Sequence, residues 1–160
     1  MKKHRFGLTI DKNSFQDAGD GLVSFPQGQI ITDDSKQRNG TIYDIPSMDL
    51  SEYKGMITAD HTDMLQCVIG KALGVAKTAN AVTISGIKFA TQNPLGQFAY
   101  DMFVAGFLTD FSIETYGPWP DDENSTYYNA KLVGLSMVVV GNNKSATTEK
   151  ARELVLNSIE

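Results

Sequence analysis

Residues 93–116 have the sequence NPLGQFAYDMFVAGFLTDFSIETY, and this stretch predicts a helix followed by a strand. Asn93 and Pro94 are typical of a helix start, with an N-cap residue followed by proline at the first helical position. Gly106 is expected to end the helix. Apolar side chains recur between these points at helical spacing, at Leu95, Phe98, Ala99, Met102 and Ala105.

The strand expected from Leu108 to Tyr116 has one polar face. Asp110, Ser112 and Glu114 are separated by apolar residues, so a pleated strand places all three on the same side. An ordinary half-buried strand shows the same alternation. The pattern therefore makes Ser112 eligible as a nucleophile and does not assign that role.

The rest of the chain is rich in short strand patterns bounded by turn residues, which predicts a barrel or a sandwich. A nearly continuous apolar strand is expected at 130–140 and an amphipathic helix at 145–159. Polar loops at 33–40 and 117–125 are candidate substrate walls. The other expected strands are 6–10, 22–25, 29–32, 55–60, 67–75 and 81–89.

Length and composition favour one domain covering residues 1–160, with residues 1–5 as a disordered tail. A net charge of −5 argues against nucleic acid or anionic lipid as a partner. Cys67 is the only cysteine, which excludes an internal disulfide and fits a reducing compartment. The basic start is followed by an apolar run too short for a signal peptide, and no run approaches the ~20 apolar residues that span a bilayer. We expect a soluble protein made in the cytoplasm.

Imidazole chemistry can use only His4 or His61, because the chain has two histidines. His4 lies in the charged N-terminal tail. His61 follows the strand pattern 55–60, where a strand should leave the core and enter a loop. Without other context, a surface histidine is the ordinary interpretation of His61.

A metal site is not predicted. Asp60, His61 and Asp63 resemble part of one, but neither a second histidine nor a further carboxylate is close in the sequence. Cys67 lies in an apolar strand pattern, where a buried cysteine is the commoner outcome. The glycines match neither a P-loop nor a dinucleotide fingerprint, so no cofactor is expected.

The order of three segments resembles the tailed-phage prohead protease family, which is distantly similar to the herpesvirus assemblin proteases. They look like the family's histidine strand with its "IG" turn, its serine strand, and its late strand with an asparagine-containing exit turn. In this chain the three segments are 55–63 with 68–71, 105–113, and 132–138 with 141–143. With their spacers they cover about residues 45–146.

The resemblance implies a mainly β, α+β fold: a closed or partly closed antiparallel β-barrel flanked by helices, as in herpesvirus proteases. It implies a serine endopeptidase with Ser112 as nucleophile and His61 as general base. Its substrates would be scaffold and major capsid protein, cleaved inside the immature capsid (the prohead) in the host bacterial cytoplasm. Self-cleavage and a homo-oligomer are both compatible with this assignment.

The chain departs from the family at the catalytic acid. The family's late strand usually carries a glutamate two residues before its serine, but this chain has Gly134 before Ser136. Two residues after the nucleophile, where the family usually has glycine, it has Glu114. Our hypothesis is that the acid has migrated to Glu114, with Asp63 and Asp110 as rivals and a dyad without a carboxylate as a further alternative.

Two other functions stay open from the sequence. Loss of the usual glutamate also suits an inactive protease-like protein that binds scaffold or forms part of the shell interior. A small hydrolase with an unrelated substrate is the other, because a fold does not define a function.

Overall fold

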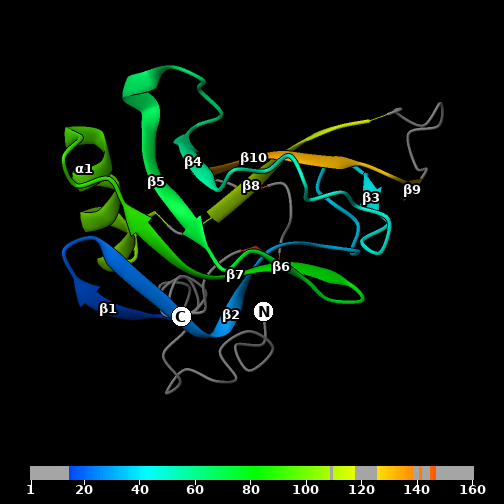
Figure 1. The fold of residues 1–160 in the computed structure, drawn as a ribbon, viewed down its shortest axis with the longest axis horizontal. Helices are drawn as coiled ribbons and strands as arrows, with labels where there is room; N and C mark the ends of the chain where they lie inside the picture. Colours follow the sequence, from blue (N-terminus) through cyan, green and yellow to red (C-terminus); the bar gives the residue numbers. More distant parts are fainter. Residues whose placement is uncertain (1–14, 109, 118–125, 139–140, 142–144, 147–160) are drawn as a thin grey trace, which may run out of the picture.

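The computed structural model describes residues 15–108, 110–117, 126–138, 141 and 145–146 (Figure 1). Within these ranges the protein is mainly β with one α-helix, so the predicted α+β class is confirmed. The elements are β1 (Gln16–Gly19), β2 (Leu22–Asp33), β3 (Ile42–Tyr43), β4 (Met56–Ala59), the 3-10 helix η2 (Leu65–Cys67), β5 (Val68–Leu73), β6 (Ala76–Lys77), β7 (Ala81–Phe89), α1 (Pro94–Val104), β8 (Asp110–Tyr116), β9 (Thr126–Tyr127) and β10 (Lys131–Val138).

The main sheet has the strand order β1-β2-β7-β5-β4-β10-β8, with β6 paired to β7. It is not closed, so the expectation of a closed barrel is wrong: β1 and β8 end the sheet and do not pair with each other. Nor is it purely antiparallel, because β4 and β10 run parallel. A parallel pair needs a long connection, and here β5, β7 and α1 lie in the chain between the two strands.

The strands predicted at 22–25 and 29–32 are one continuous strand, β2. Pro26 and Gly28 lie between them, and Gly28 has a φ of 77°. The pairing with β7 shifts register between Ser24 and Gln29. Proline cannot donate to a ladder, so the strand bulges at this point and continues instead of ending.

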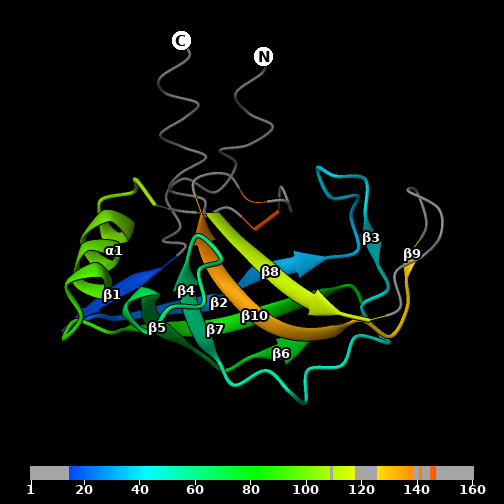
Figure 2. The same cartoon turned by 90° about the horizontal axis from the view of Figure 1, so that it is seen from above.

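The helix predicted from Pro94 forms as α1 and ends at Val104. The Asn93 side chain accepts a hydrogen bond from the Leu95 N–H, and its amide donates to the carbonyls of Gln66 and Val68. This residue therefore caps the helix and ties it to the start of β5. Figure 2 shows α1 at one end of the sheet and the β3–β9 pair at the other.

The core is built around Phe103 of α1, whose side chain is fully buried. Its ring packs against Phe15, Phe25, Phe89 and Phe111. Phe111 belongs to β8. Its contact with Phe103 therefore fixes β8 on the core and so also fixes the opposite face of this strand. Asp110, Ser112 and Glu114 alternate with Phe111 along this strand.

Several predicted elements are confirmed and others lie outside the described residues. The strand at 81–89 has the predicted bounds. Within the strand predicted at 130–140, Lys131–Val138 form β10, which pairs with β4 and β8, and residues 139–140 lie outside the described ranges. The strand predicted at 67–75 is Val68–Leu73, because Cys67 ends η2. The strand expected at 6–10, the tail at 1–5 and residues 147–159 of the expected C-terminal helix fall outside the described part of the chain. No helix in the described ranges is long and apolar enough to cross a membrane.

Candidate active site

Three neighbouring strands present hydroxyl groups in one row. Thr58 of β4 pairs with Ser136 of β10, and Ser136 pairs with Ser112 of β8. Directly paired residues point their side chains to the same face of a sheet, with Cβ atoms about 4.5–5.5 Å apart. Ser136 is fully buried, whereas Ser112 is partly exposed. Of these two serines, only Ser112 is therefore accessible to a substrate.

His61 lies above this row, in the turn that follows β4. The turn is closed by the Thr62 N–H, which donates to the Ala59 carbonyl at 3.0 Å. Its two central residues, Asp60 and His61, have φ values of 54° and 55°, a left-handed conformation that is uncommon for residues other than glycine. The backbone of His61 is thus held in an unusual geometry at the point where the strand leaves the sheet.

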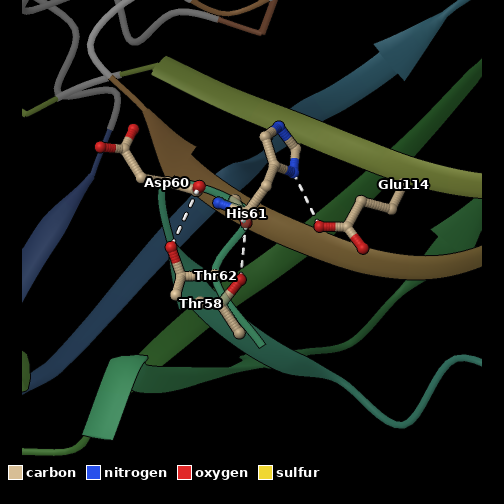
Figure 3. Close-up of polar contacts among 6 residues, drawn as sticks. Thr58, Asp60, His61, Thr62 and Glu114 are labelled. Carbon is tan, nitrogen blue, oxygen red and sulfur yellow. Dashed lines mark hydrogen bonds and ion pairs between the residues drawn. The ribbon is translucent and has the colours of Figure 1, made fainter. Parts of the chain in front are cut away.

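The His61 ring points to Glu114 of β8 (Figure 3). Its Nδ1 lies 2.8 Å from the Glu114 Oε1, and about a third of each side chain is exposed. A carboxylate accepts hydrogen bonds, so this contact assigns the proton to Nδ1 and leaves the Nε2 lone pair free. That is the arrangement in which a carboxylate orients a histidine to act as a base.

Gly134 provides the space that Glu114 occupies. It is the direct partner of Glu114 in the β8–β10 pairing. A Cβ atom at Gly134 would lie 3.1 Å from the Glu114 Oε2 and 3.3 Å from its Cβ. A side chain on β10 would therefore compete with the carboxylate for one position on the face of the sheet.

The structure does not bring the two rival carboxylates to His61. Asp63 is exposed and makes no hydrogen bond or ion pair with a described residue. Asp110 is buried at the start of β8, where its Oδ2 accepts the Gly141 N–H at 2.9 Å. Geometry therefore favours Glu114 among the three candidates for the acid.

In the described part of the chain, Ser112 and His61 make no hydrogen bond with each other. They are linked through Ser136, which pairs with Ser112 and whose Oγ accepts the His61 N–H at 3.1 Å. The described residues thus hold the histidine–carboxylate contact that a catalytic triad would need, without the serine–histidine contact. Catalytic hydrogen bonds are often long in free enzymes and tighten when substrate binds.

The polar loop at 33–40 reaches the start of β8, near Asp110. Arg38 Nε donates to the Gly141 carbonyl at 2.8 Å, on the peptide that Asp110 also holds. The Phe111 N–H donates to the Ala146 carbonyl at 3.0 Å. One of the two predicted substrate walls therefore lies at the start of β8. Most of the other, residues 118–125, is outside the described ranges.

Comparisons with protein-family models, with curated proteins and with solved structures found no match to this chain. The site must therefore be interpreted from its own chemistry. Within the described ranges, no group of three histidine, cysteine or carboxylate side chains is arranged to hold a metal ion. Among the described residues, this face brings together the partly exposed Ser112 hydroxyl, the His61 imidazole and the Glu114 carboxylate.

Thr58 and Ser136 belong to the site, and the sequence interpretation missed their part in it. Ser136 Oγ lies 2.6 Å from Thr58 Oγ1 and also accepts the His61 N–H. A signal was present in the sequence, because Ser136 is a single hydroxyl within the apolar run Leu132–Val138. Buried hydroxyl groups are costly unless they are hydrogen-bonded, so such a residue indicates a partner.

Proposed function

We propose that this protein is a serine endopeptidase in which Ser112 is the nucleophile, His61 the general base and Glu114 the orienting acid. The observation that carries the proposal is the 2.8 Å contact between His61 Nδ1 and Glu114 Oε1, because Glu114 lies on β8, two residues after Ser112. A serine hydroxyl is a weak nucleophile until a base takes its proton.

In the proposed reaction, Glu114 holds the Nδ1 proton of His61 and Nε2 removes the proton from Ser112. The Ser112 Oγ then attacks the peptide carbonyl, and His61 returns the proton to the leaving amine. Water hydrolyses the acyl-enzyme in the second half of the reaction. The Ser112–His61 hydrogen bond forms when substrate is bound.

The substrate class rests on the order of the three segments, which resembles the prohead proteases and, more distantly, the herpesvirus assemblins. On this basis the substrates are scaffold and major capsid protein inside the immature shell, with self-cleavage as a further reaction. The exchange of glycine and glutamate between β8 and β10 supports the resemblance to this family. It returns a carboxylate to the place on the sheet where the family's glutamate would project.

A serine-directed phosphonate tests the chemistry. We expect covalent labelling of Ser112, loss of labelling in Ser112→Ala and a decrease of at least about 1,000-fold in His61→Ala. Ser51→Ala, an exposed serine outside the site, is the matched control and should label at the wild-type rate. Cleavage of a scaffold-derived peptide, with small esters as the comparison, distinguishes a protease from a general hydrolase.

One observation favours a second candidate, a protease-like protein that binds scaffold without cleaving it. In the described part of the chain, Ser112 makes no hydrogen bond to His61. This alternative would be supported, and the enzyme rejected, if folded wild-type protein bound a scaffold peptide without cleaving it and the phosphonate did not label Ser112.

A further inference from the structure

The Ser136 hydroxyl of β10 contacts the turn that carries His61. Its side chain is fully buried, and its Oγ accepts the His61 N–H at 3.1 Å. The same Oγ is 2.6 Å from the Thr58 Oγ1, and either of these hydroxyls can be the donor. A serine oxygen has two acceptor positions and one proton, so both contacts can be made together.

The turn above Ser136 needs such support. Asp60 and His61 are consecutive residues with positive φ, a combination that two L-residues adopt only when their surroundings hold it. Two successive N–H groups of the turn are bound by β10: the Asp60 N–H donates to the Met137 carbonyl at 3.1 Å, and the His61 N–H donates to Ser136. Of these two bonds, only the second depends on a side chain.

The orientation of the His61 ring follows from this backbone geometry. A left-handed residue directs its Cβ differently from an extended one, so release of the His61 N–H would allow the ring to turn away from Glu114. Because Ser136 is paired with Ser112, the hydroxyl that holds the base is also adjacent to the nucleophile.

We propose that Ser136 is a positioning residue, whose buried hydroxyl fixes the backbone of His61 so that its ring stays bonded to Glu114. The role of the positioned ring as a base rests on the proposed function; the positioning itself does not. Thr58 supports Ser136 as its neighbour and acts on His61 only through it.

The experiment uses the full chain and two measurements. The first is the NMR signal of the proton on His61 Nδ1, which is readily assigned because the only other histidine is His4. The second is the rate of phosphonate labelling of Ser112. Ser136→Ala should lose or strongly broaden the Nδ1 proton signal and lower the labelling rate at least about 10-fold.

The matched control is Ser85→Ala, which removes a hydroxyl bonded to the Leu73 carbonyl on β5, away from the turn. It should keep the wild-type Nδ1 signal and labelling rate. Thr58→Val should give a smaller loss than Ser136→Ala, because the His61 N–H keeps its acceptor. Wild-type signal and rate in folded Ser136→Ala would overturn the proposal.

If Ser136→Ala does not fold, Ser136→Cys tests the same point, since a thiol fills similar space and accepts hydrogen bonds weakly. A wild-type Nδ1 signal in that variant would likewise reject the positioning role. If wild-type protein does not label at all, the proposed enzyme fails, while the NMR comparison still decides whether Ser136 positions His61.

Discussion

Glu114 and Gly134 lie directly opposite each other in the antiparallel pairing of β8 with β10. Glycine leaves the face of the sheet open at the point where the carboxylate of Glu114 turns toward His61. The acid and the space for it therefore form one unit, shared between two strands.

This pairing predicts a rescue by exchange. Gly134→Glu alone places two carboxylates in one position and should lower labelling of Ser112, because like charges repel and the side chains collide. Glu114→Gly alone should lower it by about 100-fold or more, through loss of the carboxylate that we propose orients His61. The double variant, Glu114→Gly with Gly134→Glu, should recover at least about 10-fold over Glu114→Gly. Equal labelling rates in Glu114→Gly and in the double variant would show that a glutamate at position 134 cannot replace Glu114.

The two rival acids should respond differently from Glu114. In Asp63→Asn, the phosphonate should label Ser112 at the wild-type rate, because Asp63 makes no hydrogen bond or ion pair with a described residue. Asp110→Asn weakens a charge-assisted hydrogen bond to the Gly141 N–H, so we expect a stability loss of about 1–2 kcal/mol. Denaturant unfolding and labelling, measured on the same samples, separate the two effects. A 100-fold loss of labelling in Asp63→Asn would show that Glu114 is the wrong acid.

The left-handed turn gives a prediction about stability. Asp60 has a φ of 54°, which glycine adopts without cost and a β-branched residue resists. We expect Asp60→Gly to be as stable as the wild type or up to about 1 kcal/mol more stable, and Asp60→Val to lose about 1–2 kcal/mol. Urea unfolding of both variants is the measurement. If valine were tolerated as well as glycine, the turn would have a different backbone conformation in solution.

The contact between α1 and the sheet depends on Gly96. A Cβ atom there would lie 2.1 Å from the Ala90 carbonyl oxygen, which is backbone and cannot move aside easily. Gly96→Ala should therefore cost about 3 kcal/mol, despite the better helix propensity of alanine. Phe98→Ala, an exposed position on the same helix, is the comparison and should change the unfolding free energy far less.

Alkaline pH should destabilise the protein through Tyr53. Burial raises the pKa of Tyr53 above its ordinary value of 10.0, and its hydroxyl donates to the Met56 carbonyl at 3.1 Å. The folded state therefore binds this proton more tightly than the unfolded state does. The resulting stability is fully present below about pH 10 and is lost as the pH rises from there toward the folded pKa.

Melting temperatures between about pH 8 and about pH 12 measure this effect, and the slope in Tyr53→Phe should be shallower than in the wild type. Tyr128→Phe, at an exposed position, should keep the wild-type slope. Parallel curves for the wild type and Tyr53→Phe would exclude Tyr53 as the cause.

The helix and most strands could be predicted because their signals are local. Asn93 and Pro94 start α1 through an N-cap and a fixed proline φ, and the alternation in β8 places Ser112 and Glu114 on one face. Scarcity of histidine directed attention to His61 before any geometry was known. The continuous β2 was missed because Pro26 and Gly28 are local breakers, whereas tertiary pairing with β7 carries the strand past them.

Long-range pairing decided the rest. Sequence patterns could not show that the sheet stays open, or that β4 and β10 lie side by side in parallel, since strand order depends on contacts between residues far apart in the chain. The same pairing brings two distant residues to His61. Glu114 lies 53 residues after His61 in the sequence, and Ser136 lies 75 residues after it. Strand alternation made Ser112 eligible and histidine scarcity pointed to His61, but their predicted roles, and that of Glu114, came from the resemblance to the prohead proteases. The register of β8, β10 and β4 favours Glu114 over Asp63 and Asp110, because a hydrogen bond requires atoms within about 3 Å.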